Sequence, residues 1–105
     1  MPPPVGPGVP RPGKLKEREL PMPRYLVESY IPRSRAMEAR AAGRDARTAA
    51  EALAREGTQV RYVRTTLLPD DETCLHIFEA ASEDAVGEVC RRAGIDTGRI
   101  VPALE

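Results

Sequence analysis

From residue 24 onward, prolines and glycines divide the chain into six segments, and this division constrains the fold more than any other feature. Four segments are rich in β-branched and aromatic residues, which predicts strands at residues 24–31, 60–68, 73–80 and 99–104. Two segments carry apolar residues at helical spacing, which predicts one helix capped by Ser34 and closed by Gly57, and another capped by Ser82 and closed by Gly94. The resulting order, β-α-β-β-α-β, predicts a ferredoxin-like α+β fold in which two helices cover one face of a four-stranded antiparallel sheet.

The N-terminal part of the chain has a different composition. Its prolines stand at positions 2, 3, 4, 7, 10 and 12, and its glycines at 6, 8 and 13. Such a segment buries too little apolar surface to offset the entropy lost on ordering. The sequence therefore predicts a disordered tail over residues 1–22 and a single ferredoxin-like domain over residues 23–105.

Charge and composition restrict the possible partners and the location. The 16 basic and 16 acidic residues cancel, which argues against nucleic-acid binding. The sequence has no apolar run of the roughly 18 residues that a membrane span needs, and its 2 cysteines are too few for a disulfide framework. A cytoplasmic protein without membrane contact is therefore expected. With only 4% aromatic residues its core is thin, so pairing with a second copy is expected to add stability.

The alternation of side chains along a strand assigns the polar residues to faces. The first and third strands are neighbours at the centre of this topology, and each carries one glutamate among apolar residues. We expect Glu28 and Glu79 on the face that no helix covers, because burying an unpaired charge beneath the helices is costly. The apolar residues around them, which are Leu26, Tyr30, Leu75 and Ile77, predict a homodimer through this open sheet face.

Several interpretations of these polar residues stay open. The two glutamates could bind a cation, share a proton, or pair with an arginine such as Arg61 or Arg64.

Cys74 and His76 point the same way, about 7 Å apart along the strand, and could hold a soft metal between them. The simpler expectation is that both pack beneath the helices, with the histidine hydrogen-bonded. His76 and Glu79 lie on opposite faces of a regular strand, so sharing a ligand would require a bulge.

Three motifs in order resemble a known family. They are "MPRYLVESYIP" (22–32), "VRYVRTTLLPDDETCLHIFEAASEDAV" (60–86) and "RRAGIDTGRI" (91–100). The set is similar to a small bacterial ferredoxin-like family, long known as a domain of unknown function, with a nickel-binding member. The resemblance implies a homodimeric α/β barrel and divalent metal binding. Glu28 and Glu79 stand where the family commonly has glutamate, and His76 stands where a cysteine is frequent.

The sequence therefore leads to one main hypothesis and two alternatives. The main hypothesis is a small dimeric protein that binds Ni²⁺ or another divalent transition metal, with Glu28, Glu79 and His76 as candidate ligands. One alternative is a cofactor-independent enzyme of the dimeric α/β-barrel type, an isomerase or monooxygenase. The other is a non-catalytic module whose sheet face serves only to dimerise.

Overall fold

The computed structural model describes residues 22–104, so the predicted tail lies outside the described residues except for Met22. The elements follow in the order β1 (Arg24–Tyr30), η1 (Arg33–Arg35), α2 (Glu38–Arg55), β2 (Val60–Leu68), η2 (Pro69–Asp71), β3 (Thr73–Ala80), α3 (Glu83–Ala93) and β4 (Thr97–Ala103). This order confirms the predicted α+β, ferredoxin-like fold.

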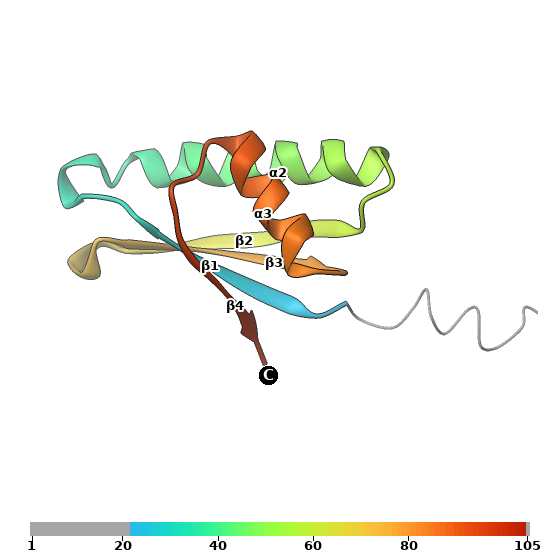
Figure 1. The fold of residues 1–105 in the computed structure, drawn as a ribbon. Helices are drawn as coiled ribbons and strands as arrows, with labels where there is room; N and C mark the ends of the chain where they lie inside the picture. The colour runs from blue at the N-terminus through green and yellow to red at the C-terminus, as the bar shows by residue number, and fades with distance from the viewer. Residues whose placement is uncertain (1–21, 105) are drawn as a thin grey trace, which may run out of the picture.

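The four strands form one antiparallel sheet in the order β2-β3-β1-β4. The first and third strands are therefore central neighbours, as predicted, with Leu26 paired to Ile77 and Val27 to His76. Figure 1 shows α2 and α3 together on one side of the sheet. The expected barrel is not formed by the single chain, because the sheet stays open with β2 and β4 as its two edges.

One predicted helix start is confirmed and the other is wrong. The Oγ of Ser82 caps α3 by accepting a hydrogen bond from the N–H of Ala85 at 3.2 Å. Ser34 lies instead in η1, and α2 has no side-chain cap. The reason is local: the chain makes a 3-10 turn directly after Pro32, so the hydroxyl of Ser34 precedes the first turn of α2.

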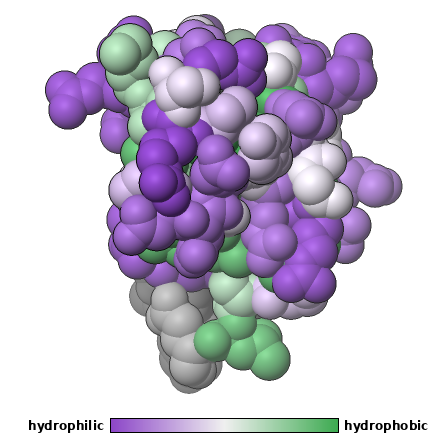
Figure 2. All heavy atoms as spheres, turned by 90° about the vertical axis from the view of Figure 1, so that its left-hand side faces the viewer, coloured by the Kyte–Doolittle hydropathy of each residue, from purple (hydrophilic) through white to green (hydrophobic). Residues whose placement is uncertain are grey.

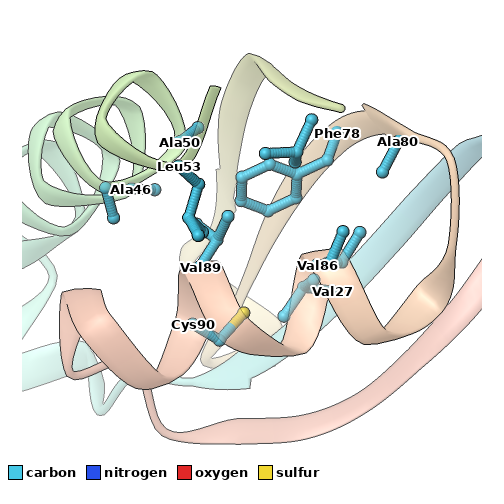
Figure 3. Close-up of a cluster of buried hydrophobic side chains, with 12 residues drawn as sticks. Val27, Ala46, Ala50, Leu53, Phe78, Ala80, Val86, Val89 and Cys90 are labelled. Carbon is cyan, nitrogen blue, oxygen red and sulfur yellow. The ribbon is translucent and has the colours of Figure 1, made fainter. Parts of the chain in front are cut away.

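Phe78 is at the centre of the core between sheet and helices (Figure 3). Its side chain is fully buried, and it lies between Leu53 of α2 and Val86 of α3. The ring of Tyr62 meets it edge-on, with 5.8 Å between ring centroids. The buried face of α2 consists otherwise of small residues, which let the helix lie close to the sheet; they are Ala39, Gly43, Ala46, Ala49 and Ala50.

The opposite face of the sheet has no helix over it (Figure 1). Leu26, Leu75, Ile77 and Val101 on this face are only partly buried, and Tyr30 is 60% exposed. Seen from the end that carries η1 and the β2–β3 turn, the surface is mostly hydrophilic, with small apolar areas between charged side chains (Figure 2). Among residues 22–104, no helix has the length and apolar character needed to cross a membrane.

Candidate functional site

His76 lies on the helix-covered side of the central strand β3, next to Val27 of β1 and Thr65 of β2. Its side chain is 1% exposed, which confirms that it packs beneath the helices. The Nδ1 of His76 lies 2.8 Å from the Oγ1 of Thr65, and this oxygen lies 2.7 Å from the hydroxyl of Tyr62. The three side chains form a chain of hydrogen bonds that runs from the edge strand β2 into the centre of the sheet.

The second ring nitrogen of His76 has no such partner. Within residues 22–104, Nε2 of His76 is the one buried side-chain nitrogen or oxygen without a hydrogen bond. His76 lines a cavity of about 310 Å³ together with Cys74 and Ser29, and residues 93–96 form part of its wall. We call this space the helix-side cavity. Because an unsatisfied buried polar atom is costly, the free nitrogen indicates a place where a ligand or a water molecule binds.

Acidic side chains surround the helix-side cavity. Glu38 and Asp45 reach it from α2, Asp96 reaches it from the segment after α3, and all three are exposed. The one cation in the lining is Arg35, whose Nε lies 3.6 Å from a carboxylate oxygen of Glu38. The lining therefore carries more negative than positive charge, which favours a cation over an anion in this cavity.

Burial sets the protonation of the two residues that were candidates for holding a soft metal. It lowers the pKa of His76 below its ordinary value, so the imidazole is neutral at pH 7 and keeps a lone pair for a ligand. It raises the pKa of the Cys74 thiol, so this sulfur stays protonated at neutral pH. His76 is therefore ready to bind a metal ion, whereas Cys74 must first lose a proton.

Glu79 lies on the open sheet face, as expected from strand parity, and is held by two arginines. One carboxylate oxygen lies 2.6 Å from Nη2 of Arg61, and the other lies 3.1 Å from Nε of Arg24. The hydrogen bonds from Arg61 and then from Arg24 lower the pKa of Glu79 below its ordinary value. Of the roles considered for Glu79, the pairing with Arg61 is the one that the geometry displays.

Glu28 occupies the same face but a different part of it. It accepts two hydrogen bonds from Arg99 of β4, at 3.1 and 3.2 Å. In the sheet register Glu28 is opposite Leu75, while Glu79 is opposite Arg24, which comes four residues before Glu28 in β1. At the rise of a β-strand this separation is about 13 Å. The two glutamates therefore share a face but not a site within one chain.

The three candidate metal ligands are not brought together in one chain, since His76 lies beneath the helices and the two glutamates lie on the open face. Within residues 22–104, no group of three or more His, Cys, Asp or Glu side chains is placed to hold a metal ion. The helix-side cavity fits nickel in part: imidazole nitrogen and carboxylate oxygen are suitable donors, but they do not converge on one point. A metal there must draw in the exposed carboxylates or take ligands from another chain.

Several residues around His76 were missed from the sequence, among them Asp45 and Thr65. Asp45 follows Glu38 by seven positions, and this spacing alone puts both on one side of a helix, so helical periodicity could have identified it. Thr65 could not be found this way, because β2 contains a bulge between Tyr62 and Arg64 that changes which residues face the helices.

Comparison with known proteins identifies the family to which this chain belongs. Residues 25–102 match the model of a family described as "Nickel responsive protein SCO4226-like". The search of curated proteins gave no match, and the search of solved structures gave none either. The match spans β1 to β4 and includes every residue of the hydrogen-bond chain that ends at His76. The chain therefore belongs to the SCO4226-like family of nickel responsive proteins.

Proposed function

We propose that this protein binds nickel, or a similar divalent transition metal, at His76 in the helix-side cavity. The observation that carries the proposal is the unpartnered Nε2 of a buried imidazole in a cavity with an acidic rim. The family description supports the choice of metal. A bound divalent ion would add positive charge to this rim, in which Arg35 is the one cation.

Three side chains would hold the metal. His76 supplies Nε2, and Asp45 and Asp96 supply carboxylate oxygens by rotating inward from their exposed positions. Thr65 orients the ring: when Nδ1–H of His76 donates a hydrogen bond to the Oγ1 of Thr65, the lone pair of Nε2 is free for the metal. The carboxylate of Glu38 is already paired with Arg35, which leaves it less available.

The homodimer through the open sheet face is part of the proposal. A second copy would bury the partly exposed side chains of Leu26, Leu75, Ile77 and Val101, and burial of a continuous apolar face is the main driving force for such association. A cytoplasmic location is also proposed, and it is supported by the two free, buried cysteines, Cys74 and Cys90.

Glu28 and Glu79 rank below His76 as ligands in this proposal. In the proposed dimer they lie at or beside the interface, where carboxylates of two copies could contribute to one site. A metal at either residue must displace the arginines that now hold the carboxylate, Arg99 at Glu28 and Arg61 and Arg24 at Glu79. Displacement of charge-assisted hydrogen bonds lowers the affinity for the metal.

Calorimetric titration of the metal-free full chain with Ni²⁺ at pH 7.5 tests the metal site. We expect saturable binding, a loss of affinity of at least about tenfold in His76→Gln, and a loss of about tenfold in Thr65→Val through the orienting hydrogen bond. Glu79→Gln is the matched control, because it removes a carboxylate from the other face. Unchanged binding in His76→Gln together with lost binding in Glu79→Gln would transfer the site to the open face.

Light scattering coupled to size-exclusion chromatography tests the dimer separately. The substitution Ile77→Arg puts a charge at the centre of the open face, next to Leu26 in the register, and should convert a dimer into monomers. Arg40→Glu on α2, which covers the other side of the sheet (Figure 1), changes charge without touching this face and should leave the mass unchanged. A wild-type protein that elutes as a monomer at all concentrations contradicts the dimer.

A further inference from the structure

A second cavity lies on the other side of α2, against the edge strand β2. It has a volume of about 380 Å³, and three of its lining residues are Arg40, Arg44 and Arg47. These residues are spaced four and three positions apart, so they form one row along the helix. We call this space the arginine groove. Its volume is within the range of small-molecule sites, roughly 300–1,000 Å³.

The positive charge of the groove is not balanced by the protein. Within residues 22–104, no carboxylate forms an ion pair with Arg40, Arg44 or Arg47, although arginines elsewhere, such as Arg61 and Arg99, are paired. Like charges at this helical spacing repel one another and weaken the helix. A row of three unpaired guanidinium groups in a cavity therefore lacks a negatively charged partner.

The floor of the groove supplies further donors and a rigid shape. Tyr62 and Thr65 line it, and their hydroxyls lie 2.7 Å apart. The guanidinium of Arg47 lies 5.2 Å from the centre of the Tyr62 ring, which fixes the arginine over the aromatic face. A side chain at Gly43 would enter this space, because its Cβ would lie 2.9 Å from the hydroxyl oxygen of Tyr62. The helix therefore passes closely over the two hydroxyls, which form a well-packed floor for the groove.

We infer that the arginine groove binds a small molecule with a multiply charged oxyanion, either a phosphate ester or diphosphate or a polycarboxylate. Guanidinium groups bind both kinds of oxyanion through paired N–H donors. The hydroxyl of Tyr62 at the floor provides a neutral donor beside them. A long nucleic-acid backbone fits less well, since the row is short and the chain as a whole has a net charge of 0. This groove is a separate cavity from the helix-side cavity, although Thr65 at its floor is hydrogen-bonded to His76, the proposed metal ligand.

The test is calorimetric titration of the full chain with pyrophosphate and, separately, with citrate, in a metal-free buffer at constant ionic strength. Stronger binding of pyrophosphate identifies a phosphorylated ligand, and stronger binding of citrate identifies a polycarboxylate. Arg44→Gln should weaken binding about tenfold or more, because it removes charge-assisted hydrogen bonds. Arg55→Gln is the matched control: Arg55 is exposed on the same helix but does not line the groove.

Two results would overturn the inference. The first is the absence of saturable binding for both anions, even in low salt. The second is an equal loss in Arg44→Gln and Arg55→Gln, which would show that the anions respond only to the general charge of the helix. Circular dichroism of each variant confirms that it is folded, and both substitutions are at exposed positions where folding should be preserved.

Discussion

Substitution of Gly43 by alanine tests how closely α2 approaches the sheet. In an unobstructed helix, alanine in place of glycine stabilises the fold by about 1 kcal/mol. At Gly43, however, the added methyl group would lie 2.9 Å from the hydroxyl oxygen of Tyr62 and 3.0 Å from the Oγ1 of Thr65. Forcing a methyl group into packed surroundings costs about 1–3 kcal/mol, and losing the hydrogen bond between the two hydroxyls costs about 1 kcal/mol more. The expected net effect is a destabilisation of about 1–3 kcal/mol.

Urea unfolding followed by circular dichroism measures this effect, with Gly87→Ala as the matched control. A Cβ at Gly87 would have only the Cδ1 of Ile100 within reach, at 4.0 Å, so this variant should be more stable than wild type by about 0.5–1 kcal/mol. The two Gly→Ala substitutions should thus change the free energy of unfolding in opposite directions. If Gly43→Ala proved as stabilising as Gly87→Ala, the close contact between α2 and the Tyr62–Thr65 pair would be refuted.

Four further substitutions test protonation and capping. Burial lowers the pKa of His76 from its ordinary value of 6.5, so the unfolded state binds this proton more readily. The free energy of unfolding should therefore decrease as the pH falls below about 6.5. His76→Gln should make this pH dependence flatter, as measured by urea unfolding between pH 5 and 7. An unchanged pH dependence in the variant would contradict the buried, neutral histidine. The arginine hydrogen bonds that lower the pKa of Glu79 contribute stability above its ordinary pKa of 4.5, and this stability is lost as the pH falls through the folded pKa. Glu79→Gln should then show a shallower loss of stability in acid, and a wild-type slope in the variant would argue against the ion pairs. Ser82→Ala removes the cap of α3 and should lower the free energy of unfolding by about 1 kcal/mol. Ser34 makes no cap hydrogen bond, so Ser34→Ala should be nearly neutral in the same thermal unfolding experiment. Equal losses of stability in the two variants would exclude the capping role of Ser82.

The element order and the faces of the strands could be predicted because they depend on local patterns. Proline and glycine positions set the segment limits, and alternation along β3 placed His76 beneath the helices and Glu79 on the open face, as the structure has them. The placements of His76 and Glu79 both follow from the alternation of side chains along a strand. The ion pair between Glu79 and Arg61 was one of the pairings that the sequence left open, and the structure has it.

The surroundings of His76 could not be predicted in the same way. Tyr62 and Thr65 are three positions apart, so in a regular strand they would point to opposite faces. The bulge in β2 adds a residue between them, and both then pair with helix-side positions of β3, Phe78 and His76. The hydrogen-bond chain to His76 and the floor of the arginine groove both result from this one irregularity, which the sequence does not mark with a glycine or a proline.

The central position of β1 has a consequence for the order in which the protein forms. This strand is synthesised first, yet both of its neighbours, β3 and β4, come later, and its hydrogen bonds to Arg99 reach across 71 residues of sequence. Until β4 has left the ribosome, β1 has at most one neighbour and exposes the other half of its backbone hydrogen-bonding groups. Long-range pairing of this kind slows folding and extends the time during which an unpaired edge can meet another nascent chain.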